Sequence, residues 1–223
     1  MKNTKTISIL GCGWVGQALS EYLMPYYHVH CLGRDRNANE KAKKYHCDVF
    51  VITIPPRDNY LEVIKQNLAM IVRSTQVIFL SSISFYDGKA SIVEAENMIQ
   101  DLHENSVILR LGGLMGYDRI AGKYTAGKVL TADSRTNYIH RDDVLGIILS
   151  LIKCEVSNEV FDAVAPIQST KKKIFSQNAN VFGFEQTEFL GGDEVGKRLS
   201  PRKLCNTLGY VFLKEDVHMF WDT

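Results

Sequence analysis

The chain has 223 residues, of which 45% are hydrophobic and 23% are charged, and its formal net charge at pH 7 is +1. This composition is typical of a globular protein with one large domain, or with one domain and a small cap. The charge argues against a nucleic acid or a membrane surface as the main partner, and no apolar run approaches the roughly 20 residues of a membrane span. Because the first residues, MKNTKT, lead into a strand pattern rather than a signal peptide, we expect a cytoplasmic protein.

The first predicted element is a buried strand over residues 7–10, and a helical pattern begins a few residues later. Between them stands the hexapeptide GCGWVG. In a dinucleotide site Gly11 would make the tight turn, Gly13 would let the backbone approach a pyrophosphate, and Gly16 would let helix and strand pack closely. The alternative is that the glycines only make a turn. The residues that we expect to bind a cofactor here are Gly11, Gly13, Trp14, Val15 and Gly16.

The five cysteines are scattered along the chain and form no CxxC pair. This arrangement predicts reduced thiols and gives little support to a metal site or to catalysis by cysteine. Cys12 is the one whose oxidation would disturb function, because it lies inside the glycine loop. The five are Cys12, Cys31, Cys47, Cys154 and Cys205.

A second strand is predicted over residues 27–32, and charged residues follow it. At this place an acid accepts hydrogen bonds from a free ribose 2′-hydroxyl, whereas an arginine pairs with a 2′-phosphate. Asp35 stands between Arg34 and Arg36, so both types are present. Since Arg34 comes first and Arg36 reinforces it, we favour NADP over NAD; solvated loop charges are the alternative.

A third strand, over residues 48–54, is apolar on both faces and stops at two prolines, as expected at the centre of a parallel sheet. Only about fifteen residues separate it from the second strand. A full doubly wound sheet usually fits another strand and helix there, so we expect a shortened or missing unit near residues 35–47. The end of the third strand is predicted to border the cofactor, at Thr53, Ile54 and Pro55.

Strands and helices then alternate, which predicts parallel β-α-β units with right-handed crossovers. The predicted helices cover residues 59–73, 90–104, 142–153 and 168–182, and the predicted strands cover residues 76–80, 106–111, 136–140 and 160–164. Segments 187–190 and 201–208 would complete a small mixed cap. We therefore expect an α/β, Rossmann-type, doubly wound and mostly parallel sheet over residues 1–165, with a substrate-side cap over residues 166–223 and no clean linker.

Six segments together resemble the short-chain dehydrogenase/reductase superfamily, in its atypical extended branch of NAD(P)-dependent epimerases and dehydratases. They are, in chain order, GCGWVG, FLSSISFYDG, the EAE of residues 94–96, LRLGGLMGYDR, NYIHRDDV and GKRLSPRKL. The resemblance covers nearly the whole chain. It implies an NAD(P) cofactor, a small polar carbonyl or sugar substrate, and further cofactor contacts at Ser81, Gly112 and Gly113.

The resemblance also implies a catalytic role for Ser82, which matches the serine that hydrogen-bonds the reacting oxygen in relatives. Those relatives carry a downstream YxxxK motif for acid/base chemistry, and this chain has none near that site. If Glu96 matches the acid that usually follows the lysine, Ile92 stands where the lysine should be. Tyr86 could replace the missing tyrosine as proton donor, with Lys89 nearby to favour its phenolate. A packed Tyr86 and a capping Ser82 hydroxyl are the alternatives.

Other charged residues allow a substrate-binding and a structural interpretation. His140 beside Asp142 could act as a base, but in relatives the matching stretch docks the following helix. Arg110 and Arg119 could bind a substrate phosphate or carboxylate, and so could basic residues of the cap. The cap residues are Lys197, Arg198, Arg202 and Lys203.

Two classes of function remain open from the sequence. The first is an NADP-preferring reductase or epimerase-like enzyme for a small, anionic or neutral, polar compound. The second is a non-catalytic dinucleotide sensor that has lost the Tyr-Lys pair. In either case relatives suggest a homodimer through the helices of residues 59–73 and 90–104.

Overall fold

The computed structural model describes residues 5–33, 45–191 and 196–221. These residues form two compact units. The first unit runs to Arg110 and also takes in Leu145–Phe161, whereas the second unit holds Leu111–Val144 and the residues from Asp162 onward. Within the described residues no helix is both long and apolar enough to cross a membrane.

The first unit is built on a six-stranded sheet with the order β2-β1-β3-β4-β5-β9. The strands are β1 (Thr6–Leu10), β2 (His28–Leu32), β3 (Val49–Ile52), β4 (Gln76–Ser82), β5 (Ser106–Leu111) and β9 (Glu159–Ala163). β1 pairs in parallel with β2 and β3, and β3 pairs in parallel with β4. The carboxyl ends of these strands therefore meet at one edge of the sheet, where doubly wound folds bind their ligands.

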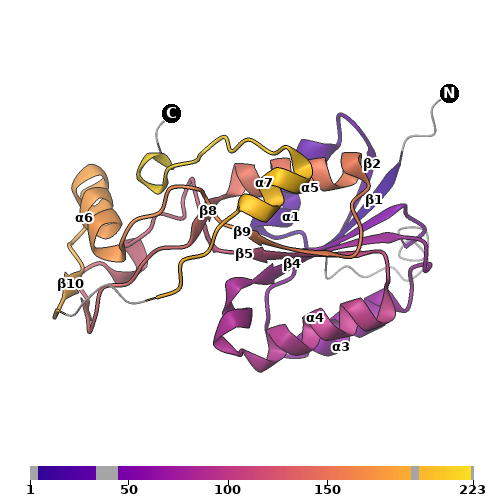
Figure 1. Ribbon diagram of the computed structural model, residues 1–223, viewed down its shortest axis with the longest axis horizontal. Helices are drawn as coiled ribbons and strands as arrows, with labels where there is room; N and C mark the ends of the chain where they lie inside the picture. Colours follow the sequence, from indigo (N-terminus) through magenta and orange to yellow (C-terminus); the bar gives the residue numbers. More distant parts are fainter. Residues whose placement is uncertain (1–4, 34–44, 192–195, 222–223) are drawn as a thin grey trace. The chain divides into compact units, whose positions relative to one another are not determined.

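Helices cover both faces of this sheet (Figure 1). Figure 1 shows α3 (Tyr60–Leu68) and α4 (Ala90–Leu102) on one face, and α1 (Trp14–Leu23) with α5 (Arg141–Cys154) on the other. The face under α3 and α4 buries large side chains that carry no polar atoms. They include Phe50, Ile52, Ile64, Phe79, Ile92 and Ile99, all fully buried or nearly so. Burial of this apolar surface is the main force that holds α3 and α4 to the sheet.

The predicted α/β fold with a parallel sheet is confirmed, and the helix over residues 59–73 is shorter than expected. It ends at Leu68, and Ile71 and Val72, which prolonged the helical pattern, lie in the turns beyond it. β2 is the outer strand on its side of the described sheet. Residues 34–44 lie outside the described residues, so the predicted shortened unit can be followed only from Tyr45 onward.

The second unit contains two small parallel pairs of strands whose pairing the sequence did not reveal, although the strand predicted over residues 136–140 is present over Tyr138–His140. β6 (Gly113–Met115) pairs with β8 (Tyr138–His140), and β7 (Val129–Leu130) pairs with β10 (Glu188–Phe189). Its helices are α6 (Lys171–Phe182) and α7 (Arg202–Leu208), with two short 3-10 turns, η2 (Lys123–Thr125) and η3 (Val217–Met219).

Thr170 is the N-cap of helix α6, and its side chain accepts a hydrogen bond from the backbone N–H of Lys173. The C-cap is Gly183, which has the left-handed conformation. Its buried face joins a core cluster that includes Tyr138, Ile174, Phe175, Val217 and Phe220.

Candidate functional site

The glycine loop between β1 and α1 leaves no space at two of its three glycines. Gly11 has φ +107°, a left-handed conformation that other residues rarely adopt. Its backbone N–H donates to the carbonyl of Leu32, 2.9 Å away, at the end of β2. The hydroxyl of Thr53 lies 2.6 Å from the carbonyl oxygen of Gly11, which ties the loop to the end of β3. A Cβ atom on Gly16 would lie 1.8 Å from that same carbonyl oxygen, so only glycine lets α1 approach β1 this closely.

Gly13 differs from its neighbours because a Cβ atom there would meet nothing within 4 Å. It is the N-cap residue of α1, and no side chain caps the first turn of that helix. The N-terminal end of α1, which is the positive end of the helix dipole, therefore faces open space at this position. This is the cradle that a pyrophosphate requires, so the loop fits a dinucleotide.

The other residues predicted to contact the cofactor in this region differ in their surroundings. The hydroxyl of Thr53 donates a hydrogen bond to the glycine loop. A methyl group of Ile54 lies 2.8 Å from the position that a Cβ atom of Gly11 would take, so Ile54 packs against the turn. Pro55 is exposed just beyond β3. Arg34 and Arg36, which carried the preference for NADP, lie outside the described residues.

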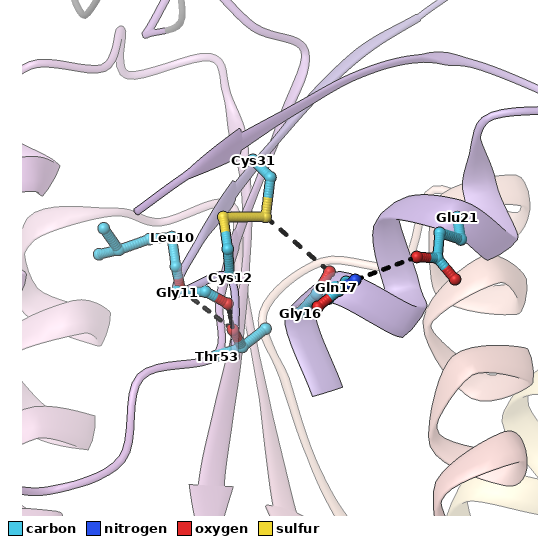
Figure 2. The surroundings of a disulfide bond; sticks show 8 residues. All are labelled: Leu10, Gly11, Cys12, Gly16, Gln17, Glu21, Cys31 and Thr53. Carbon is cyan, nitrogen blue, oxygen red and sulfur yellow. Dashed lines mark hydrogen bonds between the residues drawn. A yellow bond between two sulfur atoms is a disulfide. The ribbon is translucent and has the colours of Figure 1, made fainter. Parts of the chain in front are cut away.

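The prediction of reduced thiols is wrong for two of the five cysteines. Cys12 and Cys31 form a disulfide that joins the glycine loop to β2, with their Cα atoms 5.8 Å apart (Figure 2). Their separation of 19 residues in sequence gave no signal for this pairing. Parallel pairing of β1 with β2 brings them together, since Ile9 is opposite Cys31.

A second cluster of polar side chains lies at the ends of β4 and β5, around the buried carboxylate of Glu96 on α4. Arg110 binds this carboxylate with its fork: Nε lies 3.1 Å from both oxygens and Nη2 lies 2.7 Å from Oε2. The hydroxyl of Ser81 also donates to Glu96. Burial lowers the pKa of Arg110, but the hydrogen bonds and charge of Glu96 and Tyr86 more than offset this, so the pKa is raised and the guanidinium stays charged.

The same guanidinium reaches Tyr86. Nη1 of Arg110 donates a hydrogen bond of 3.1 Å to the phenol oxygen, and its central carbon lies 3.5 Å from the centre of the Phe85 ring. Lys89, which the sequence allowed either beside Tyr86 or in solvent, is exposed at the N-terminal end of α4. Arg110, one of the residues that could bind substrate, is engaged by Glu96 and Tyr86. Glu96 was the sequence signal for this cluster, because a buried acid requires a cationic or hydrogen-bonding partner.

Ser82 makes the contacts of the capping alternative. It is the N-cap of the 3-10 turn η1 (Ile83–Asp87), and its hydroxyl oxygen accepts from the backbone N–H of Ser84 at 3.2 Å. The hydroxyl also donates to the side chain of Ser84. These bonds hold the hydroxyl of Ser82 against Ser84. The catalytic role of Ser82 stays a prediction.

In the second unit, the predicted cofactor residues Gly112 and Gly113 meet tight packing requirements. A Cβ on Gly112 would lie 2.1 Å from the carbonyl oxygen of Asn137, and one on Gly113 would lie 2.6 Å from the ring of Tyr138. Both glycines thus allow this segment to approach β8 and the residue before it closely, and their contact with a cofactor stays a prediction.

His140 is buried in the second unit between two aromatic rings. The ring centres of Tyr117 and Phe220 lie 5.6 and 5.5 Å from that of His140. Nδ1 of His140 accepts from the backbone N–H of Asp142 at 3.2 Å, and burial lowers the pKa of the ring despite the nearby carboxylates. These contacts support the structural interpretation, in which His140 fixes the start of α5.

Comparisons with known proteins agree with this architecture. The chain is 28% identical over 198 residues to Protein YeeZ of Escherichia coli K12, covering 76% of this chain and 72% of that protein. Its structure is similar to a candidate NAD-dependent epimerase/dehydratase from Methylobacillus flagellatus, with a TM-score of 0.80, 20% identity, and coverage of 98% and 96% of the two chains. It is also similar to human epimerase family protein SDR39U1 with NADPH, with a TM-score of 0.75, 15% identity, and coverage of 96% and 97%.

No protein-family model matches the chain. The likeness to these structures confirms the α/β fold with a parallel central sheet that the sequence predicted.

The glycine loop generates a paired test of packing. Gly16→Ala should lower the free energy of unfolding by at least about 1–3 kcal/mol, because the new methyl group must displace the backbone of Gly11. Gly13→Ala, placed in open space with φ −89°, should change it by less than about 0.5 kcal/mol. Urea denaturation followed by circular dichroism measures both. Equal losses in the two variants would contradict the described loop.

The buried His140 generates a test of pH dependence. Since the pKa of its folded form lies below the unfolded value, the unfolded chain binds more protons once the pH falls below about 6.5, and stability is lost in that direction. His140→Gln should flatten the decline in unfolding free energy by up to about 1.4 kcal/mol per pH unit. Denaturation curves from pH 7.5 to 5 measure this; identical slopes for His140→Gln and the parent chain would refute it.

Proposed function

We propose that the chain binds NADP(H) at the GCGWVG loop and acts as a reductase or epimerase on a small polar carbonyl or sugar compound. The observation that carries the proposal is Gly13, which stands open at the uncapped N-terminus of α1 while Gly11 and Gly16 leave no room for a side chain. An anion of the pyrophosphate class fits this space. The presence of NADPH in the human relative of the same fold supports the choice of cofactor.

The preference for NADP rests on charge beside the adenosine ribose. Arg34 and Arg36 follow the strand whose end borders that ribose, and a guanidinium pairs with a 2′-phosphate through two parallel hydrogen bonds. The 2′-phosphate that distinguishes NADP from NAD would gain this pairing. NAD, which carries a hydroxyl there, would not.

The proton chemistry is assigned to Tyr86 and Arg110. A bound nicotinamide supplies hydride chemistry, and the protein must then deliver or remove a proton at the substrate oxygen. The phenol of Tyr86 would serve as the proton donor, and the guanidinium of Arg110, 3.1 Å away, would stabilise the phenolate that remains. Arg110 thereby takes the part that the lysine of YxxxK plays in relatives. Ser82, held by Ser84, would hydrogen-bond the reacting oxygen.

Glu96 and Ser81 act on this chemistry through Arg110. The two-point contact with Glu96 fixes the plane of the guanidinium, and Ser81 donates to the same carboxylate. Glu96 is 1% exposed in its side chain, so it holds Arg110 without contact with solvent. Both are positioning residues.

A non-catalytic sensor is the second candidate, and the absence of a YxxxK motif shortly after Ser82 favours it. The hydrogen bond between Arg110 and Tyr86 favours the enzyme, since a sensor has no need of a cation at a phenol. Turnover of any carbonyl compound with NADPH would decide for the enzyme.

The substrate class and assembly are extensions of the same proposal. An anionic substrate is suggested by the basic residues of the segment that the sequence analysis assigned to the cap, Lys197, Arg198, Arg202 and Lys203, all of which are exposed. A homodimer would form through α3 and α4, which lie side by side on one face of the first unit's sheet.

Calorimetric titration tests the cofactor. NADPH should bind with micromolar affinity and NADH more weakly, and Gly13→Asp should abolish binding because its carboxylate would fill and repel the pyrophosphate position. Gly13 has open space around it, so the variant should fold, and circular dichroism checks this. Absence of binding by all four nicotinamide dinucleotides would refute the proposal.

Steady-state kinetics test Tyr86. With NADPH and a panel of glyceraldehyde, dihydroxyacetone and their phosphates, Tyr86→Phe should lower kcat about 10²- to 10⁴-fold while the affinity for NADPH stays within twofold. Arg110→Lys keeps a charge but loses the fork, so it should shift the pH profile of kcat as well as lowering it. An unchanged kcat in Tyr86→Phe would exclude this residue as the proton donor.

A further inference from the structure

The disulfide Cys12–Cys31 lies in the candidate cofactor site itself (Figure 2). Cys12 stands between Gly11 and Gly13 in the loop and is exposed, whereas Cys31 is the last residue but one of β2 and is half-buried. The sulfur of Cys31 lies 4.0 Å from the carbonyl oxygen of Gly16, in the first turn of α1. A reductant can therefore reach the bond from the Cys12 side.

Non-covalent contacts hold the two cysteines near each other independently of the bond. The N–H of Gly11, next to Cys12, donates to the carbonyl of Leu32, next to Cys31. The parallel pairing of β1 with β2, from Thr6 opposite His28 to Leu10 opposite Leu32, holds together the strand that precedes Cys12 and the strand that contains Cys31. After reduction the thiols would thus remain adjacent, and the bond could re-form without any rearrangement of the loop. Such a pair suits reversible exchange.

The other three cysteines lack these properties. Cys47 is buried, and burial raises the pKa of its thiol to about 11. Burial also raises the pKa of Cys205. Cys154 is exposed at the end of α5 but has no cysteine partner. Of the five cysteines, all of which the structure describes, Cys12 alone is exposed and has a cysteine partner, Cys31, at bonding distance. Cys154 provides an exposed control.

A dinucleotide at this loop would pass over the disulfide. Its pyrophosphate would lie at Gly13, the residue after Cys12, and its adenosine ribose would lie beyond the end of β2, just after Cys31. The disulfide bond fixes the side chain of Cys12, which lies between the expected positions of the pyrophosphate and the ribose, to β2. With the bond broken, the exposed Cys12 side chain gains rotational freedom that binding must remove.

From this placement we infer that Cys12 and Cys31 form a thiol–disulfide exchange site whose oxidised form binds the dinucleotide more tightly than its reduced form. The inference rests on the proposed function, because it assigns a modification that regulates the same site. By linkage, a bound dinucleotide stabilises the disulfide against reduction to the same extent. Immobilising one side chain corresponds to about a two- to tenfold difference in affinity.

The exchange requires a thiol of the glutathione class as reductant. Its thiolate attacks the sulfur of Cys12, the bond to Cys31 breaks, and Cys31 leaves as a thiolate that takes up a proton. A second glutathione thiolate attacks the mixed disulfide and releases oxidised glutathione and the Cys12 thiolate, which is protonated in turn. Two electrons and two protons thus pass from two glutathione molecules to the cysteine pair. Oxidised glutathione reverses the reaction.

Paired calorimetric titrations test the inference on the full chain. One sample is equilibrated with oxidised glutathione and the other with reduced glutathione, both are desalted without oxygen, and each is titrated with NADPH. The oxidised sample should bind about two- to tenfold more tightly. Separately, peptide mass spectrometry after alkylation should show that saturating NADPH slows reduction of the Cys12–Cys31 bond by glutathione.

Variants separate this effect from general oxidation. In Cys12→Ser/Cys31→Ser the two treatments should give equal affinities, while Cys154→Ser should keep the full difference. Equal or tighter binding by the reduced parent chain would overturn the inference and leave the proposed function standing. Absence of a cross-linked Cys12–Cys31 peptide in the oxidised sample would also overturn it. Absence of NADPH binding in both samples would refute the inference and the proposed function together.

Discussion

Among the described glycines, Gly16 has the least room for a side chain, because a Cβ atom there would lie 1.8 Å from the carbonyl oxygen of Gly11. This contact fixes the distance between α1 and β1, and it directs the uncapped first turn of α1 toward the open space at Gly13. The hydroxyl of Thr53, the residue after β3, donates a hydrogen bond to the same carbonyl oxygen. The candidate anion site is therefore a consequence of how helix and strand pack, and it requires no side chain of its own.

The second fixed point is the ion pair of Glu96 and Arg110. A buried carboxylate costs several kcal/mol to desolvate unless partners satisfy it. Here the guanidinium of Arg110 makes three contacts with the carboxylate of Glu96, and the hydroxyl of Ser81 makes a fourth. Such a pair is weak support for stability, because apolar residues could fill the same volume. Its second contact, to the phenol of Tyr86, offers a reason for keeping the charge.

Most of the first unit could be predicted from the sequence, because its strands are continuous apolar runs and its helices have regular apolar spacing. The strand pairs of the second unit could not, since β7 and β10 are two residues long and carry no periodic signal. The glycine loop was found because its motif is local. The Arg110–Tyr86 contact and the Cys12–Cys31 bond were missed because each joins residues far apart in sequence whose proximity depends on which strands are neighbours.

The order of the strands explains why these features share one edge of the first unit's sheet. The loop with Cys12 follows β1, Cys31 is near the end of β2, Thr53 follows β3, and Ser82 and Arg110 are at the ends of β4 and β5. Since the strands run parallel, all of these positions lie at the carboxyl-terminal edge of the sheet, where each strand leads into a loop. A ligand long enough to cross from β2 to β4 would therefore meet the cysteine pair, the open glycine and the Tyr86 cluster in that order. A nicotinamide dinucleotide, with an adenosine at one end and a reactive ring at the other, has this form.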